Sequence, residues 1–312
     1  VFIKILVLGS NGLVGSSLLR FLSQANKKFE LIGSTRKDAD LFSFDETKKL
    51  LLDTNPDILI NAAAKVGGIY ANNTKRAEFL LENLKININV LEASVELPSL
   101  SIINLGSSCI YPLNAKDPIK EESYMTGTLE PTNSPYAMAK LTAIELGMSL
   151  KEQYGKKVIN LMPTNLYGPN DNFSSLDSHV IPGLISRMYE SKINNEEVFK
   201  IWGTGKPLRE FLYVDDLSSA IEFVISNNID NDLLNVGSGE EISIKELSTK
   251  IKNLIKFEGT LEFDNTKPDG NPRKLLDSTL INNLGWRSNI NLDEGLELTF
   301  QWFEKNYKSL RK

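Results

Sequence analysis

Cysteine, histidine, basic runs and long apolar runs are all scarce in this sequence, and each scarcity excludes a class of protein. One Cys and one His occur in 312 residues, which excludes an internal disulfide framework and a Cys/His zinc cluster. No apolar run reaches the roughly 18 residues that a membrane span needs. The formal net charge is −5 and no basic block is present, which argues against a protein that binds nucleic-acid backbones. By default we expect a reducing, cytoplasmic setting and no metal site.

The remaining composition is that of a soluble globular protein. Hydrophobic residues make up 41% of the chain and charged residues 24%, both ordinary fractions. The length exceeds one average domain, so we expect either one elaborated domain or two. The opening VFIKILVLG is short and leads directly into a glycine turn, which favours a first strand over a signal peptide.

A glycine-rich turn follows this first apolar run. The run from Lys4 leads to Gly9, and a helical pattern of leucines begins near Leu18. A strand, a glycine turn and a helix in this order are typical of a dinucleotide-binding site, whose phosphates lie against the helix N-terminus. An unrelated α/β protein can also carry such a turn. The predicted phosphate-binding residues are Gly9, Ser10, Asn11, Gly12, Leu13, Val14 and Gly15.

The end of the second predicted strand indicates which dinucleotide binds. The strand covers 29–33 and is followed by Ser34, Thr35 and Arg36. NAD sites usually place an acid here, on the ribose 2′-hydroxyl, whereas hydroxyls and Arg36 suit a 2′-phosphate. We therefore expect NADP(H), with a solvated surface Arg36 as the alternative.

A Tyr and a Lys four residues apart lie at the start of a predicted helix. Ser134 is expected to cap this helix and Pro135 to take its first position. The spacing puts Tyr136 and Lys140 on one helical face. A free phenol has a pKa of about 10 and is a poor acid, but a nearby ammonium favours the phenolate and lowers that pKa. An amphipathic helix with one buried lysine stem is the alternative.

Strands alternate with helices over residues 1–166, which predicts a doubly wound parallel sheet of the Rossmann type. We expect residues 1–166 to form an NADP(H)-binding domain. The later segment 211–236 is expected to fold back into this domain. Residues 167–312 are expected to form mainly a smaller C-terminal α/β substrate lobe. Further strands are expected at 57–61, 101–106, 157–162, 198–205, 233–236 and 260–263. Helices are expected at about 73–96, 134–154, 180–189, 216–226, 243–256 and 292–306. Residues 209–216 are expected to open the helix at 216–226.

Several longer segments carry a resemblance to a known family. GxxGxxG, GSSCIYP, YxxxK, PTNLYGP and REFxxVDD occur in the order found in the extended short-chain dehydrogenase/reductases, which this chain resembles. Within them, segments such as NAAAKVGGIYANNT, GTLEPTNSPYAMAK, SHVIP, WGTGKPLREF and KPDGNPRKLLD are similar to the GDP-L-fucose synthase family. The resemblance implies NADPH-dependent 3,5-epimerisation and 4-reduction of GDP-4-keto-6-deoxy-D-mannose by a homodimer paired through helices 73–96 and 134–154. The alternatives are an epimerase or reductase of another 4-keto sugar nucleotide, and a non-catalytic NADP(H)-sensing protein.

The resemblance also implies roles for individual residues. Ser107, Tyr136 and Lys140 correspond to the reductase triad, and Cys109 and His179 to the groups that move protons at C3 and C5. Related dehydratases carry an Asp-Glu pair where this chain has Ser108 and Cys109, which counts against water elimination. Without the resemblance, a lone Cys and a lone His are most often inert. The implied cofactor residues further include Leu105, Gly106, Ser107, Ser108, Lys140, Pro163, Thr164, Asn165, Leu166 and His179, and the implied substrate residues are Asn165, Arg187, Trp202, Arg209, Asp269 and Lys274.

Overall fold

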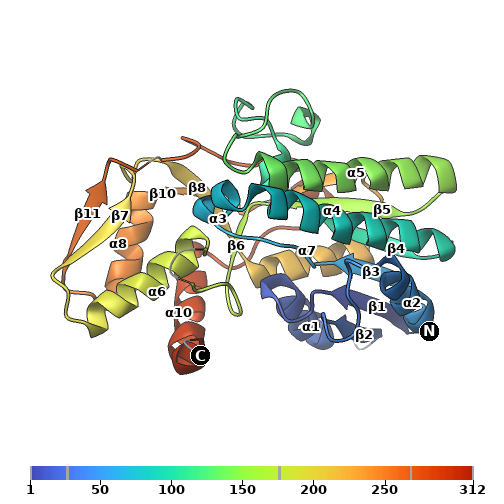
Figure 1. Ribbon diagram of the computed structural model, residues 1–312, viewed down its shortest axis with the longest axis horizontal. Helices are drawn as coiled ribbons and strands as arrows, with labels where there is room; N and C mark the ends of the chain where they lie inside the picture. The colour runs from blue at the N-terminus through green and yellow to red at the C-terminus, as the bar shows by residue number, and fades with distance from the viewer. Residues whose placement is uncertain (1, 26–27, 175–176, 268, 311–312) are drawn as a thin grey trace.

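The main body of the protein is a six-stranded sheet with helices on both faces (Figure 1). A computed structural model describes residues 2–25, 28–174, 177–267 and 269–310. The sheet has the strand order β2-β1-β3-β4-β5-β9 and every neighbouring pair is parallel. The predicted doubly wound sheet is therefore confirmed. Its strands are β1 (Ile3–Leu8), β2 (Phe29–Ser34), β3 (Ile58–Asn61), β4 (Ser101–Leu105), β5 (Val158–Pro163) and β9 (Leu233–Val236).

The strands are apolar along their length because both sheet faces are covered. Ile5 and Val7 of β1 point into a core shared with α1 (Leu13–Ala25) and α7 (Val214–Ser226), whereas Leu6 and Leu8 point into a second core. The second core includes side chains from α2 (Phe44–Thr54), α4 (Arg76–Ala93) and α5 (Ser134–Tyr154). Successive side chains of a strand face opposite sides, so a continuous apolar run is what a strand between two helical layers requires.

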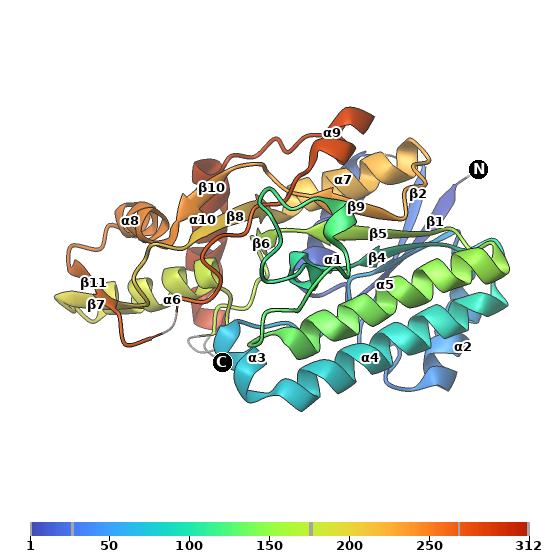
Figure 2. The same ribbon diagram turned by 90° about the horizontal axis from the view of Figure 1, so that it is seen from above.

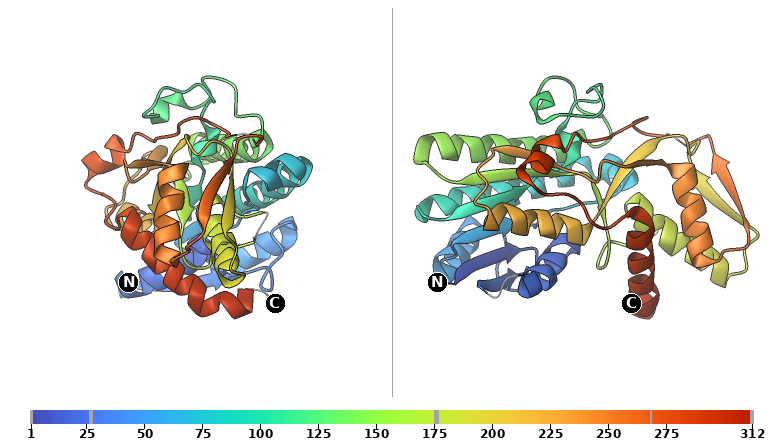
Figure 3. Two further views of the ribbon diagram at one scale, coloured as in Figure 1. Left: turned by 90° about the vertical axis from the view of Figure 1, so that its left-hand side faces the viewer. Right: turned by 180° about the vertical axis from the view of Figure 1, so that it is seen from behind.

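A second, smaller part lies at the opposite end of the molecule from β2 and α1, as Figure 1 and Figure 3 show. It contains a three-stranded sheet in the order β10-β8-β6 and a parallel pair of β11 and β7. Their core is rich in aromatic residues, among them Phe173, Tyr189 and Phe303. The strands are β6 (Asn165–Tyr167), β7 (Val198–Trp202), β8 (Leu208–Tyr213), β10 (Glu241–Ser243) and β11 (Thr260–Asp264), and the helices are α6 (Val180–Ile193), α8 (Ile244–Ile255) and α10 (Leu292–Leu310).

Two expectations about local structure are corrected, and four elements were not expected. The helix expected over 73–96 is interrupted at Lys75 (φ −114°, ψ 39°), which separates α3 (Ile69–Thr74) from α4. The segment expected to open a helix at Arg209 is instead strand β8, which pairs with β6 and β10, and helix α7 begins only at Val214. Helices α2 and α9 (Thr279–Leu284) and strands β6 and β10 were not predicted. Short elements of this kind are decided by pairing partners that are distant in sequence.

The part of the chain that the structure describes meets the requirements of neither a membrane-spanning helix nor a metal site. No helix there is long and apolar enough to cross a bilayer. No group of three or more His, Cys, Asp or Glu side chains is placed to hold a metal ion.

Candidate functional site

The glycine turn leaves an open backbone cradle at the N-terminus of α1. Gly9 has φ +71°, a conformation that glycine adopts without strain. A Cβ at Gly15 would lie 2.2 Å from the Gly9 carbonyl oxygen, so the helix packs there only without a side chain. A Cβ at Gly12 would meet only that same carbonyl, at 3.5 Å. The backbone at Gly12 is thus open, and the N–H groups at the start of α1 fit a dinucleotide pyrophosphate.

Arg36 lies just after β2 in an exposed position. Its guanidinium is 5.8 Å from the centroid of the Phe42 ring and pairs with no carboxylate among the described residues. Asp38, two residues later, is instead tied to Thr35, whose N–H and hydroxyl each donate to its carboxylate at 2.8 Å. The end of β2 therefore offers a free cation.

Lys140 is almost fully buried beneath the carboxyl end of β4. Its exposed fraction is 3%, and its Nζ donates to the Leu105 carbonyl at 2.7 Å. Burial lowers the pKa of this ammonium to about 8. The Nζ lies 5.8 Å from the centroid of the Tyr136 ring. Lys140 therefore makes its hydrogen bond to the backbone rather than to the phenol.

Tyr136 is half-buried in the first turn of α5, and its ring meets that of Phe79 edge-on at 6.4 Å. The expectation that the neighbouring ammonium lowers the pKa of this phenol is wrong. Burial raises that pKa and negative charge at Cys109 adds to the rise, while a hydrogen bond with Ser107 opposes it. Desolvation disfavours the phenolate more strongly than the hydrogen bond stabilises it. Tyr136 is therefore protonated at neutral pH and holds a proton to give.

The thiol of Cys109 lies within the same cluster of side chains. Ser107 accepts a hydrogen bond from the Cys109 N–H on its Oγ, at 3.2 Å. Cys109 is a half-buried free cysteine, and its Sγ accepts a hydrogen bond from Asn133 Nδ2 at 3.4 Å. The Oδ1 of Asn133 is buried without a hydrogen-bond partner in the described part of the chain. Sequence reasoning missed Asn133, although it lies three residues before Tyr136.

The start of α5 differs from the predicted arrangement. Asn133, not Ser134, is the N-cap residue, and Ser134 is the first helical residue, followed by Pro135. The Asn133 side chain makes no cap hydrogen bond because its amide is turned towards Cys109. The expected capping role of Ser134 is therefore wrong.

His179 is half-buried at the N-cap of α6, and its side chain makes no cap hydrogen bond. Burial lowers its pKa below the ordinary value of 6.5. The imidazole is therefore neutral at pH 7, a state in which it can accept a proton.

Arg209 on β8 brings positive charge to the thiol. It is half-buried, and its Nη2 donates to the Asp269 carbonyl at 3.5 Å. Burial lowers the pKa of the guanidinium, and negative charge at Asp269 opposes this shift. Negative charge at Cys109 and at Glu130 acts in the same direction as that at Asp269, so these groups lie within electrostatic range of Arg209.

The other predicted substrate-binding residues differ in their exposure and in the contacts that they already make within the protein. Both carboxylate oxygens of Asp269 accept hydrogen bonds from Thr204, at 2.6 and 2.8 Å, so this side chain already holds a loop. Arg187 is half-buried, its guanidinium lying 5.3 Å from the Phe199 ring centroid. Trp202 is 49% exposed. Lys274 is half-buried.

The segment after β5 is fixed by a buried glutamate that sequence reasoning also missed. The carbonyl oxygen of Glu210 accepts hydrogen bonds from Asn165 Nδ2 at 2.8 Å and from Thr164 Oγ1 at 3.2 Å. Its fully buried carboxylate accepts the N–H groups of Gly239 at 2.8 Å and Leu276 at 3.0 Å. Glu210 therefore links four separate chain segments at the junction between the two sheets. Glu210 follows Arg209 directly in the REFxxVDD segment, and this position could have identified Glu210 as a candidate site residue from the sequence.

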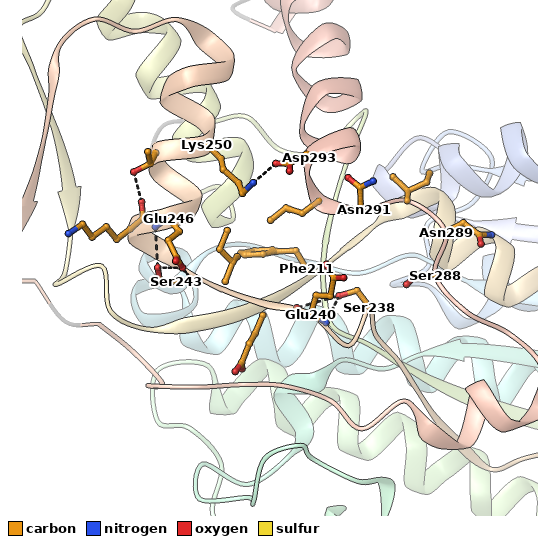
Figure 4. Close-up of a pocket in the computed structure, with 16 residues that line it drawn as sticks. Phe211, Ser238, Glu240, Ser243, Glu246, Lys250, Ser288, Asn289, Asn291 and Asp293 are labelled. Carbon is orange, nitrogen blue, oxygen red and sulfur yellow. Dashed lines mark hydrogen bonds and ion pairs between the residues drawn. The ribbon is translucent and has the colours of Figure 1, made fainter.

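Two cavities lie in the smaller part or at its boundary, and only one of them borders this cluster. A cavity of about 670 Å³ is lined by residues of the 113–132 and 269–273 segments, including Glu130, Thr132 and Asp269. A larger cavity of about 920 Å³ lies between α8, β10 and the start of α10 (Figure 4). It contains none of the predicted site residues, so cavity size alone would point to the wrong place.

Comparison with known proteins agrees with this geometry. The model of the NAD dependent epimerase/dehydratase family matches residues 5–237. GDP-L-fucose synthase 1 of Arabidopsis thaliana is 45% identical, with 97% of this chain and 94% of the relative covered, and GDP-L-fucose synthase of Escherichia coli (strain K12) is 42% identical, with 99% and 98% covered. The crystal structure of a GDP-L-fucose synthetase from Naegleria fowleri bound to NADP superimposes with a TM-score of 0.89 at 29% identity, covering 99% of this chain and 96% of that one. The chain therefore belongs to the NAD dependent epimerase/dehydratase family and, within it, to the GDP-L-fucose synthase family.

Proposed function

We propose that this protein converts GDP-4-dehydro-6-deoxy-D-mannose to GDP-L-fucose by epimerisation at C3 and C5 followed by reduction at C4. The observation that carries the proposal is a thiol, Cys109, placed in one cluster with Ser107, Tyr136 and Lys140. The last three groups suffice for a reductase, whereas a further proton-transfer group is what an epimerase needs. The names of the relatives support the same reaction.

NADP(H) is the cofactor that the site fits. The open backbone at Gly12 and the N-terminus of α1 would hold its pyrophosphate, and Arg36 its 2′-phosphate. Leu105, Gly106 and Ser108 lie at and just beyond the end of β4, and Pro163 to Leu166 at the end of β5 and the start of β6. These carboxyl ends of neighbouring parallel strands meet at one sheet edge, where such folds bind dinucleotides. Bound NADPH supplies the hydride for C4.

Each residue of the cluster has a role that its surroundings support. Protons at C3 and C5 are acidic because both carbons flank the C4 carbonyl. Cys109, with an amide donor on its sulfur and Arg209 nearby, would remove such a proton as the thiolate. His179, neutral at pH 7, would take up a proton from solvent and deliver it to the opposite ring face, which balances the proton that Cys109 removes. Ser107 would hydrogen-bond the enolate oxygen that forms.

Reduction places a proton on the C4 oxygen. Tyr136 keeps its proton at neutral pH, so it would donate that proton as the hydride arrives. Lys140, held by the Leu105 carbonyl, would orient the nicotinamide ribose.

The diphosphate and the nucleotide would bind on the smaller part. Arg187, Arg209 and Lys274 supply positive charge for the diphosphate, and Trp202 offers an exposed ring to the nucleotide. Asp269 would contribute chiefly by holding the loop at Thr204, with a hydrogen bond to sugar or base as a further role.

We further propose a cytoplasmic homodimer with two domains per chain. Exposed Leu81 (55%) and Ile88 (39%) on α4 and Met138 (49%) on α5 are apolar surface that pairing of these helices would cover. Residues 1–166, with 211–236, would form the NADP(H)-binding domain and most of 167–312 the substrate lobe. A single free cysteine suits a reducing compartment.

The test is to incubate the protein with NADPH and several 4-keto sugar nucleotides while following NADPH absorbance, and to identify products by NMR. We expect fastest turnover with GDP-4-dehydro-6-deoxy-D-mannose and a product inverted at C3 and C5. Faster turnover of another 4-keto sugar nucleotide would assign the protein to that sugar instead. NADPH binding without turnover of any sugar would identify a sensing protein and overturn the proposal.

A further inference from the structure

The first turn of α5, which carries Tyr136, has no side-chain cap of its own. Its N-cap residue Asn133 makes no cap hydrogen bond, because its amide donates to Cys109. A missing cap destabilises the first turn of a helix. The turn that positions the phenol must therefore be held from elsewhere.

Arg76, the first residue of α4, instead holds the backbone that leads into α5. Its Nη1 donates to the carbonyl oxygens of Pro131 at 2.7 Å and Thr132 at 3.4 Å, and its Nη2 donates to the Ser134 hydroxyl at 3.1 Å. The planar guanidinium presents several donors in a fixed geometry, so one side chain can hold three consecutive parts of a chain segment.

A carboxylate holds the N–H groups of the same segment. The Glu130 side chain accepts hydrogen bonds from the N–H groups of Thr132 at 3.1 Å and Asn133 at 3.2 Å. Carbonyls are thus held by Arg76 and N–H groups by Glu130. The lead-in to α5 is fixed by two charged side chains instead of a cap.

The position of Arg76 is unfavourable for its own helix. A cation in the first turn of a helix opposes the helix dipole and so destabilises that helix. Its partners lie 55–58 residues away in the sequence, at the start of the neighbouring helix. Figure 2 shows α4 and α5 running alongside each other from this end. What Arg76 contributes is therefore found in α5 and not in α4.

The same face of α4 also contacts the phenol directly. Phe79 follows Arg76 by three positions, so both side chains lie on one helical face. Phe79 is 1% exposed and its ring packs edge-on against Tyr136. One turn of α4 thus fixes both the backbone before Tyr136 and the ring of Tyr136.

We propose that Arg76 is a positioning residue for reduction, which holds the first turn of α5 so that the Tyr136 hydroxyl meets the C4 oxygen of the substrate. This inference rests on the proposed function. Arg76 itself touches neither substrate nor cofactor in this account. Misplacement of a reacting group by about 1 Å can cost about 100-fold in rate.

The test replaces Arg76 with Ala and compares it with Arg287→Ala, which removes an exposed arginine in the loop between α9 and α10. We expect the Arg76→Ala protein to lose about 10- to 100-fold in kcat for NADPH oxidation, with NADPH affinity within about twofold of wild type because the cofactor turn is distant from it. Methylguanidinium at millimolar concentration should restore part of the rate, since the site is exposed, and NaCl at equal ionic strength should not. A kcat equal to that of Arg287→Ala would overturn the proposal.

A second measurement does not depend on activity. The Ala137 N–H donates to the Asn133 carbonyl at 3.0 Å and closes the first turn of α5. In hydrogen–deuterium exchange, Arg76→Ala should speed exchange at 134–140 while leaving β4 and β5 unchanged. Unchanged exchange in this segment overturns the positioning role. Faster exchange in Arg76→Ala with unchanged turnover overturns the role of this turn in catalysis. If the wild-type protein itself shows no turnover, the proposed function fails instead.

Discussion

A buried carboxyl group in the loop after β6 predicts how stability depends on pH. Asp171 is 9% exposed. Its Oδ1 accepts the Asn172 N–H at 2.7 Å, and its Oδ2 is buried with no hydrogen-bond partner among the described residues. Burial raises the pKa of this carboxyl from 3.8 to about 7, against a smaller opposing effect of that hydrogen bond. No charged neighbour contributes to the shift.

The sign and size of the effect follow from this difference. The folded protein binds a proton at Asp171 between pH 3.8 and about 7, where the unfolded chain has lost it. The unfolding free energy therefore falls as pH rises through that window. With about 1.36 kcal/mol per pKa unit, the full loss above pH 7 is roughly 4 kcal/mol, of which roughly 2.5 kcal/mol falls between pH 5 and pH 8.

Asp171→Asn removes the titration and keeps the shape of the side chain. We expect its unfolding free energy, measured by urea denaturation at fixed protein concentration, to exceed that of wild type by about 2 to 3 kcal/mol more at pH 8 than at pH 5. Asp53→Asn, at an exposed position, serves as the control and should show no such pH-dependent difference. Parallel pH profiles of the wild-type and Asp171→Asn proteins would refute the reasoning, because the buried carboxyl would then be either solvated or paired.

The remaining predictions concern the site. Arg36→Asp should weaken NADPH binding by more than NADH binding, because a charge-assisted contact becomes a repulsion; equal effects in a titration would make Arg36 a plain surface residue. Tyr136→Phe should abolish hydride transfer and keep NADPH affinity nearly intact, and stopped-flow turnover within a few-fold of wild type would contradict this. Cys109→Ala should keep the fold and NADPH binding but lose deuterium exchange from D₂O at C3 and C5, whereas exchange at wild-type rates in NMR spectra would leave a plain reductase. His179→Gln should block product formation while permitting some deuterium exchange at C3 and C5. Complete loss of this exchange, as expected for Cys109→Ala, would contradict separate roles for His179 and Cys109.

The main sheet, the cofactor turn and most of the candidate side chains could be predicted from local residue order. Buried parallel strands need continuous apolar runs, and tight turns against a helix need glycine, so both features can be read from local residue order. Local order is also enough to place Tyr136 and Lys140 one turn apart. The predicted bounds of strands β4, β5 and β9 agree closely with the observed bounds for the same reason.

Features that depend on partners distant in the chain become visible only in the folded protein. Residues 208–213 form a strand because β6 and β10 offer it hydrogen bonds, although the local pattern had suggested a helix. The pKa of Tyr136 rises because packing removes water from the phenol and places Cys109 close to it, neither of which local spacing reveals. Asn133 and Arg76 are recognisable only when α4, α5 and the Cys109 turn are in contact. Burial and hydrogen bonding between distant segments set electrostatics and position, and these are properties of the folded chain rather than of its local sequence.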